Sequence, residues 1–163
     1  MKGFYMFLAL VCFLATCTQA GPLHASCKID WTWAVNCTVV KTTIVNQIHK
    51  WTTDDNCPDG DGEKCLYTLK EETADKITAT HTTPKKHYVD DLTFTFGKNG
   101  SEICNAQGYS TSETWYAVLD YGTNYCNLHN LITGSGLDKF PKFQEVTSDS
   151  VCTQYSSRNC DKY

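Results

Sequence analysis

Carboxylates, histidines and serines are all present in this chain, but their spacing matches no common catalytic motif. A serine hydrolase of the nucleophile-elbow type needs Gly-x-Ser-x-Gly, and the nearest candidate, residues 108–112, ends in serine. Asp90 and Asp91 are adjacent, and adjacent residues of a strand point to opposite faces, so they make a poor acid–base pair. The chain also lacks a glycine-rich phosphate loop. We therefore expect a protein that is not an enzyme.

Metal-ligand spacing is missing as well. Residues 54–63 carry five carboxylates, which a hard cation could favour, but no EF-hand register fits. Counting from Asp59, for example, puts Lys64 at the position that must be glycine. We expect a solvated acidic loop, no metal and no cofactor. The histidines, which show no zinc-binding pattern, are His24, His49, His81, His87 and His129.

Residues 1–20 are expected to be a secretion signal. A lysine follows the first methionine, residues 4–16 are almost wholly apolar, and small residues precede a cleavage position after Ala20. The apolar run is shorter than the roughly 20 residues that span a bilayer. We expect residues 21–163 to form one secreted domain.

Eight cysteines remain after the expected cleavage, and an even number in a secreted chain indicates a disulfide framework. Eight cysteines allow about 105 pairings, so the sequence leaves the connectivity open. Two sequons predict glycosylation, at Asn99 in a glycine-rich turn and, less favourably, at Asn36 beside a cysteine. The eight are Cys27, Cys37, Cys57, Cys65, Cys104, Cys126, Cys152 and Cys160.

The formal charge of −4 and the pI near 5.7 provide no basic field for nucleic acid or an anionic membrane. We expect neither partner. The acidic balance mildly favours cationic partners, and the single small domain is expected to be a monomer.

Short segments of alternating polarity point to an all-β protein. Residues 65–69, 77–82, 88–96, 103–109 and 114–121 each read as a strand, with turn residues between them. Leu92, Phe94 and Phe96 share one face of their strand, as in an antiparallel sheet with one buried side. Trp31 and Trp33 also share a face and are expected to cover the core. These features predict a small antiparallel β-barrel or sandwich.

Residues 38–52 permit two interpretations. Ile44, Ile48 and Trp51 have helical spacing, whereas the β-branched residues of 38–45 favour a strand. We interpret the segment as a short helix that ends near Trp51. An alternative fold follows from it, in which a helix over residues 42–52 packs on a four- or five-stranded sheet, as in cystatins. That alternative would be a protein-binding or inhibitor module without an internal ligand cavity.

Residues 116–128, Tyr-Ala-Val-Leu-Asp-Tyr-Gly-Thr-Asn-Tyr-Cys-Asn-Leu, resemble a segment found late in the lipocalin barrel. Residues 63–69 and 77–80 are similar to the second and third lipocalin strands. The ending, residues 151–160, resembles the disulfide-stapled C-terminal tails of salivary lipocalins from blood-feeding arthropods, ticks above all. The resemblance implies disulfides that join Cys65 to Cys160 and Cys126 to Cys152.

The same resemblance implies a lipocalin-like barrel with short helical pieces, which sequesters a small hydrophobic or amine ligand such as histamine, serotonin or an eicosanoid. Contact with a host protein is a second kind of partner in that family. An amine needs aromatic walls and a counter-charge, for which Glu113 and Asp120 are candidates, although Asp120 also suits a turn cap. A close-packed core is the alternative role for the inward residues. The predicted inward residues are Tyr67, Phe94, Phe96, Trp115 and Leu119.

Overall fold

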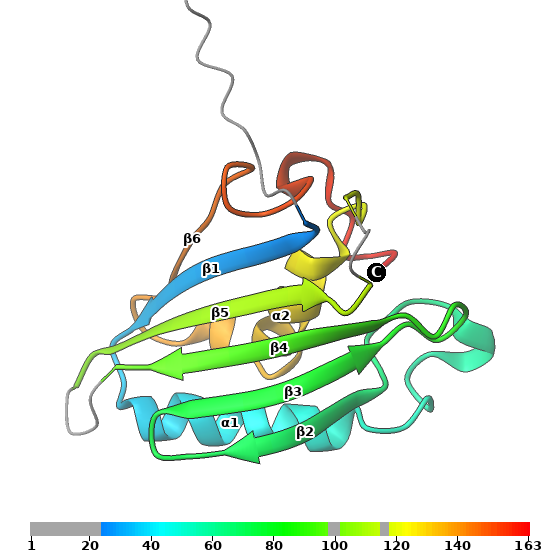
Figure 1. The fold of residues 1–163 in the computed structure, drawn as a ribbon. Coiled ribbons are helices and arrows are strands. Elements are labelled where there is room, and N and C mark those ends of the chain that lie inside the picture. The colour runs from blue at the N-terminus through cyan, green and yellow to red at the C-terminus, as the bar shows by residue number, and fades with distance from the viewer. Residues whose placement is uncertain (1–23, 98–101, 115–117) are drawn as a thin grey trace, which may run out of the picture.

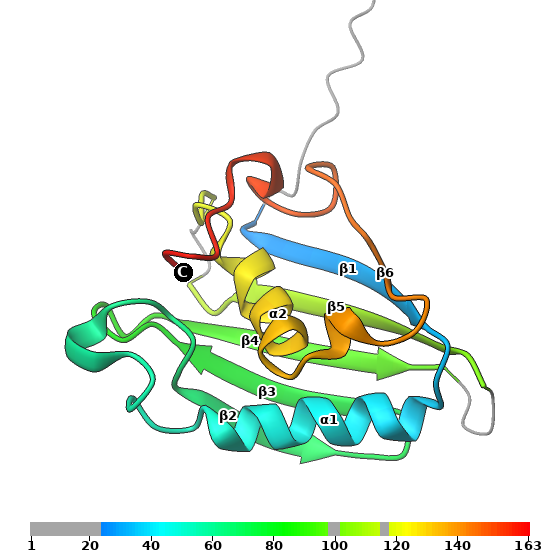
Figure 2. The same ribbon diagram turned by 180° about the vertical axis from the view of Figure 1, so that it is seen from behind.

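The computed structural model describes residues 24–97, 102–114 and 118–163. The described residues form a six-stranded antiparallel sheet with two α-helices on one of its faces (Figures 1 and 2). The helices are α1 (Cys37–Lys50) and α2 (Thr123–Gly134), and single 3-10 turns are formed by Pro58–Gly60, Leu137–Lys139 and Tyr155–Ser157. The strands are β1 (Ser26–Trp33), β2 (Tyr67–Glu72), β3 (Lys76–Thr82), β4 (Val89–Phe96), β5 (Cys104–Ser112) and β6 (Gln144–Val146).

The strands lie in the order β2-β3-β4-β5-β1-β6. β1 pairs with β5 along its whole length, from Ser26 opposite Thr111 to Trp33 opposite Cys104. β2 and the three-residue β6 are the edges, and within the described ranges no ladder joins them. The prediction of a mostly antiparallel β protein with short helices and disulfides is confirmed, while closure into a barrel is not shown.

Four of the five predicted strands match observed ones. Residues 65–69, 77–82, 88–96 and 103–109 overlap β2, β3, β4 and β5. The prediction of a strand over residues 114–121 is wrong for its described part, because Thr114 and residues 118–121 lie outside every strand. Alternation shows only that a segment suits a strand, which also needs a partner edge. Both edges of β5 are already occupied, by β4 and β1.

The helical interpretation of residues 38–52 is confirmed by α1. Asn36 caps its start, because the Asn36 side chain accepts a hydrogen bond of 2.7 Å from the Thr38 N–H. Val40, Ile44 and Ile48 are buried against the sheet. This apolar stripe at helical spacing outweighs the strand preference of the β-branched side chains, because helices in proteins are stabilised mainly by packing of an amphipathic face.

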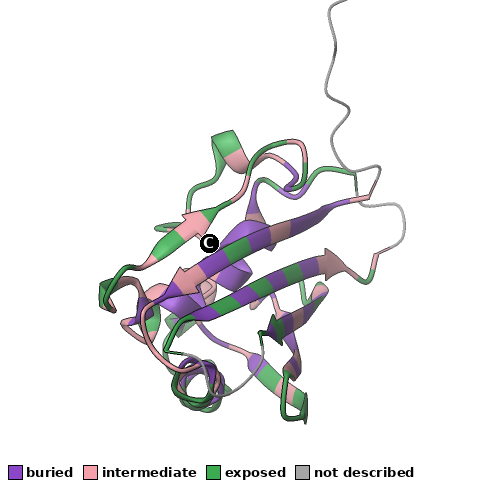
Figure 3. Ribbon diagram, turned by 90° about the vertical axis from the view of Figure 1, so that its left-hand side faces the viewer, coloured by how far each residue is buried: buried purple, intermediate pink, exposed green. Residues whose placement is uncertain are grey.

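The core fills the space between the sheet and the two helices. Buried and exposed residues alternate along the strands in Figure 3, so one sheet face is covered and the other is open to solvent. Trp31 stacks on Phe94 with ring centroids 6.1 Å apart. Trp51 lies 5.9 Å from Tyr67, centroid to centroid. The two tryptophans of β1, Trp31 and Trp33, are both buried in this core, as expected.

Gly108 on β5 is needed where the Trp31 ring crosses the sheet. A Cβ at this position would lie 2.5 Å from Cζ3 of Trp31, and the ring is fixed because its Nε1 donates a 2.8 Å hydrogen bond to Glu145. We expect Gly108→Ala to lower the free energy of unfolding by about 1–3 kcal/mol in urea titrations. Gly97→Ala is the control, since its Cβ would meet only Asn105, at 3.2 Å. Equal losses in both variants would contradict this account.

All eight predicted cysteines are in disulfides, but the pairing implied by the lipocalin resemblance is wrong. The bonds join Cys27 to Cys152, Cys37 to Cys104, Cys57 to Cys65, and Cys126 to Cys160. Cys65 is bonded to Cys57 and closes the short acidic loop, so its sulfur is not free to bond Cys160. Cys126 on α2 forms its disulfide with Cys160 instead of Cys152.

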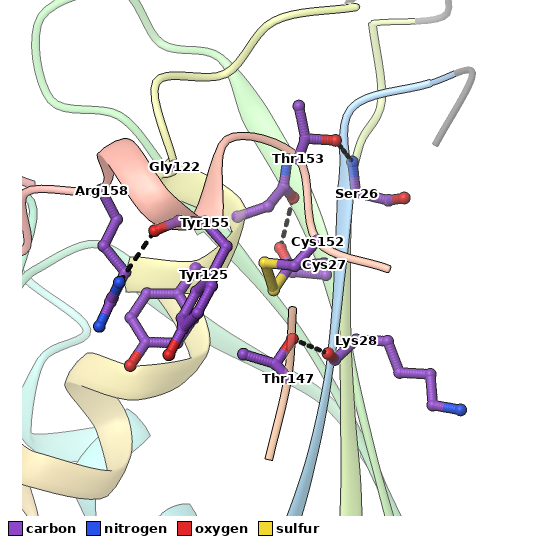
Figure 4. Close-up of a disulfide and its surroundings, with 12 residues drawn as sticks. Ser26, Cys27, Lys28, Gly122, Tyr125, Thr147, Cys152, Thr153, Tyr155 and Arg158 are labelled. Atoms are coloured by element: carbon purple, nitrogen blue, oxygen red, sulfur yellow. Dashed lines mark hydrogen bonds between the residues drawn. A yellow bond between two sulfur atoms is a disulfide. The ribbon is translucent and has the colours of Figure 1, made fainter. Parts of the chain in front are cut away.

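The C-terminal tail is stapled to the body, as predicted. Figure 4 shows the Cys27–Cys152 disulfide and the hydrogen bonds around it. The Thr153 N–H donates to the Ser26 carbonyl at 2.8 Å, and the Ser26 N–H donates back to the Thr153 hydroxyl at 3.1 Å. The tail therefore continues the sheet beyond β1 and returns to α2, where Cys160 is held.

Candidate functional site

A cleft of about 650 Å³ opens at the end of the sheet where β4 begins and β5 ends. Its walls come from the acidic loop before β2, the loop between β3 and β4, the segment before α2, and the end of the tail. The chain therefore brings together four segments that are far apart in sequence. The charged and aromatic residues that line the cleft are Asp61, Glu63, Asp90, Asp120, Tyr88, Tyr121, Tyr163, Lys85, Lys86 and Lys162.

Asp90 is a buried carboxylate at the start of β4, with only 4% of its surface exposed. Its Oδ2 accepts a 2.7 Å hydrogen bond from the side-chain amide of Asn127 on α2. Burial raises the pKa of Asp90, and hydrogen bonds from Asn127 and Ser112 work in the opposite direction. Its neighbour Asp91 is exposed on the other face, as the alternation argument required.

Asp120 is fixed at the start of α2 by three hydrogen bonds. The Gly122 N–H donates to Oδ1 at 3.0 Å, while the backbone and side-chain amides of Asn124 donate to Oδ2 at 3.1 and 2.8 Å. The predicted turn-capping role of Asp120 is confirmed. A carboxylate is favoured at this place because the N-terminus of a helix carries partial positive charge. Asp120 also lines the cleft.

Glu63 is the least satisfied acidic side chain of the cleft. Its Oε2 is buried and has no hydrogen-bond partner in the described structure. Burial, and secondarily the charge of Asp90, raise the pKa of Glu63 to about 7, and the charge of Lys162 acts against them. At pH 7 the Glu63 side chain is therefore only partly ionised.

His81 on β3 supports Glu63 from behind the cleft. Its Nε2 lies 2.8 Å from the Glu63 carbonyl oxygen, and its ring contacts Tyr67 with a centroid distance of 4.6 Å. Burial lowers the pKa of His81 to about 4, so the ring is neutral at physiological pH. Since Nε2 donates to a carbonyl, it carries the proton. His81 therefore adds no positive charge to repel a cation.

Three buried asparagines on one side of α2 hold the cleft together. Asn124, Asn127 and Asn130 recur every three residues and are at most 1% exposed. The first two bind Asp120 and Asp90, and Asn130 donates a 3.0 Å hydrogen bond to the Tyr163 carbonyl in the tail. Sequence reasoning missed them. Their signal was a polar stripe at helical spacing on a helix that also contributes Leu128 and Leu131 to the core.

The predicted ligand residues are separated by the structure. Tyr67, Phe94 and Phe96 face the interior as predicted, but they are at most 5% exposed and pack in the core. The prediction that Leu119 faces the interior is wrong, because it is 64% exposed, and it borders the cleft. Glu113 is exposed and is not a wall of this cleft, and Trp115 lies outside the described residues. Sequence reasoning missed Glu63 and Asp90 as site residues.

The predicted glycosylation sites, signal segment and acidic loop lie partly within the described residues and partly outside them. Asn36 is partly exposed at the start of α1, whereas Asn99 and residues 1–20 lie outside the described ranges. The acidic residues 54–63 form a loop that Cys57–Cys65 closes. Within the described residues, no three His, Cys, Asp or Glu side chains are grouped so that they could hold a metal ion. Of the helices in those ranges, none is long and apolar enough to cross a membrane.

A scan against protein-family models and a search of curated protein sequences find no match to this chain. The functional argument therefore depends on the cleft itself.

Asn127 is expected to oppose the rise that burial causes in the pKa of Asp90. Asn127→Leu removes the donor from Asp90 Oδ2, so we expect the pKa of Asp90 to rise further and the free energy of unfolding to fall by about 1–3 kcal/mol. Carboxyl NMR titration measures the first effect and urea denaturation the second. Asn130→Leu is the matched control, because it breaks a bond to the tail and none to Asp90. An Asp90 pKa that is the same in both variants would overturn this role.

Proposed function

We propose that this protein is a secreted, non-catalytic binder of a small organic cation, which it holds in the cleft at the end of the sheet. One observation carries the proposal: four acidic side chains and three tyrosines line this cleft, where Glu63 Oε2 is buried without a hydrogen-bond partner in the described structure. Ammonium groups form strong hydrogen bonds with carboxylates and are attracted to tyrosine faces. A protonated amine with an aromatic or apolar body, such as a biogenic amine, suits both features.

The size of the cleft agrees with a single small molecule. Ligand pockets typically enclose about 300–1,000 Å³, and the cleft has about 650 Å³. Binding without turnover is favoured because the carboxylates Asp90 and Asp120 are each bound to amides of α2. Carboxylates held in this way are less free to approach a substrate as general acids or bases.

Secretion and a lipocalin relationship are parts of the same proposal. Four disulfides favour an oxidising compartment, and residues 1–20 have the pattern of a signal peptide. The relationship to lipocalins rests on residues 116–128 and on the strand pattern of residues 63–80. The ligand site that we propose lies at the end of the sheet, outside the packed core that contains Phe94 and Phe96.

Isothermal calorimetry with histamine, serotonin and a fatty acid tests the proposal. We expect the two amines to bind at pH 8 and the anionic fatty acid to bind more weakly. Asp90→Asn should reduce amine affinity about tenfold or more. Asp91→Asn is a matched control, because the neighbouring carboxylate lies on the opposite face of β4 and should leave binding unchanged. Absence of amine binding, or equal effects of the two variants, would overturn the proposal.

A second candidate is a protein-binding module of α+β type. Helix α1 packed on the sheet resembles the alternative fold expected from the sequence, and the loop before α2 presents exposed Val118 and Leu119. Such a module would use this exposed surface, while the acidic residues of the cleft would be uninvolved. A partner whose binding is abolished by Leu119→Lys and unaffected by Asp90→Asn would favour this second candidate.

A further inference from the structure

The charges of the cleft are sorted by depth. The carboxylates Asp90 and Asp120 are 4% and 9% exposed, and Glu63 is partly buried. The lysines of the same cleft are all exposed, so they lie at its mouth.

Asp61 is the one exposed carboxylate among the described residues of this cleft, and it pairs with Lys85. Lys86 and Lys162 therefore leave an excess of positive charge at the mouth. A ligand that enters meets this excess positive charge before it reaches the buried carboxylates. A simple cation would gain nothing from the lysines and would be repelled by them on entry.

Two of the lysines at the mouth are placed by contacts with the protein. Lys85 Nζ lies 3.3 Å from Asp61 in an exposed ion pair, and Lys162 Nζ donates a 2.9 Å hydrogen bond to the Tyr163 hydroxyl. Lys162 also acts electrostatically on Glu63, so positive and negative walls are within interaction range of each other. Lysine binds phosphate well as a compact point charge.

Apolar surface surrounds this mouth. Tyr88, Leu119 and Tyr121 line the cleft and are 56%, 64% and 64% exposed. Val118, which precedes Leu119 in the chain, is 59% exposed. Large apolar side chains that cluster at the rim of a pocket usually mark a binding surface, because monomeric proteins rarely leave such patches in water. The rim could cover a hydrocarbon chain that leaves the cleft.

We propose that the natural ligand is zwitterionic, an amphiphile with a phospho-ammonium headgroup. This inference rests on the proposed function, since it places the ammonium at Glu63, Asp90 and Asp120. The phosphate, a few bonds away, then lies among Lys85, Lys86 and Lys162, and the apolar tail contacts Leu119 and Tyr121. Such a ligand satisfies both layers of charge, whereas an amine alone satisfies only the deeper one.

Choline and phosphocholine form the matched pair of probes, because they share one cation and differ by the phosphate. We expect calorimetry at pH 7.5 to give an affinity for phosphocholine about tenfold higher than for choline. Dodecylphosphocholine, used below its micelle concentration, should bind more tightly still. The double variant Lys86→Ala/Lys162→Ala should lose the advantage of phosphocholine and bind choline at least as well as the unmodified protein. Lys70→Ala, on β2 outside the cleft, is the control.

The outcomes separate the two proposals. Equal affinities for choline and phosphocholine would overturn the zwitterion inference and leave a cation binder. Failure of choline, phosphocholine and the amines alike would overturn both. A further arm with phosphatidylcholine vesicles separates two sources of the headgroup. We expect the protein to remain in the supernatant on sedimentation with vesicles, as for a carrier of free amphiphiles, and co-sedimentation would overturn that carrier role.

Discussion

Glu63→Gln is expected to make the protein more stable at pH 8 and, at the same time, a much weaker cation binder. Burial and the charge of Asp90 raise the pKa of Glu63 from 4.5 to about 7. The native protein then keeps the proton longer than the unfolded chain, so stability is lost as the pH rises from about 4.5 through 7. Because glutamine cannot ionise, the variant does not lose this stability as the pH rises. We expect a gain of about 1–2 kcal/mol at pH 8, after allowance for solvent screening, and almost none at pH 4.

The binding effect of the same variant has the opposite sign. An ionised Glu63 supplies charge to a ligand cation, so we expect Glu63→Gln to lower the affinity at pH 8 about tenfold or more. Affinity of the unmodified protein should fall as the pH drops below 7, because Glu63 takes up its proton, and that fall should be smaller in the variant. Urea denaturation and calorimetry at both pH values measure the two effects, with Asp91→Asn as the control. A variant that loses stability at pH 8, or that keeps full affinity there, contradicts our assignment.

The pKa of His81 is shifted in the opposite direction, so Glu63→Gln should also change how stability depends on pH. Burial lowers the pKa of His81 to about 4 from 6.5, so its contribution is present above pH 6.5 and is lost as the pH falls toward 4. In the unmodified protein Glu63 compensates over most of this range, because its own contribution grows as the pH falls from 7 to 4.5. With Glu63 replaced, we expect the stability to decline visibly between pH 6.5 and 4.

The sheet could be predicted from the sequence because its signal is local. Leu92, Phe94 and Phe96 alternate with threonines in β4, and that pattern depends only on neighbours in the chain. The helix α1 was readable for the same reason, through Ile44 and Ile48. The segment before α2 was misleading, because its alternation suits a strand although its described residues lie outside every strand of the sheet. Pairing is decided by the whole fold, and local preference cannot supply it.

The site could not be predicted because its residues belong to different segments. Sequence reasoning rejected Asp90 correctly as a partner of Asp91, but its real neighbours are Asn127 on α2 and Glu63 in the acidic loop. Burial, which shifts the pKa of Glu63, is a property of the fold as well. The disulfide partner of Cys126 was equally hidden, since any of the other seven cysteines was compatible with the sequence.

The Cys126–Cys160 disulfide is expected to hold a wall of the ligand site as well as the fold. It fixes the tail that brings Lys162 and Tyr163 to the cleft. Cys126→Ala/Cys160→Ala frees a loop with a sequence separation of 34, which should reduce the free energy of unfolding by about 3–4 kcal/mol. Affinity for phosphocholine should fall about tenfold or more, because the lysine and tyrosine of the tail are no longer held in place.

A second disulfide separates the effect on stability from the effect on the site. Cys37–Cys104 joins the start of α1 to the start of β5, at the opposite end of the sheet from the cleft (Figure 1). Its sequence separation of 67 is larger, so Cys37→Ala/Cys104→Ala should lose at least as much stability, about 4 kcal/mol. Ligand affinity, measured where both variants are still folded, should stay close to that of the unmodified protein. If the two variants lose affinity equally, the Cys126–Cys160 disulfide contributes only to stability. The tail is then not a wall of the ligand site.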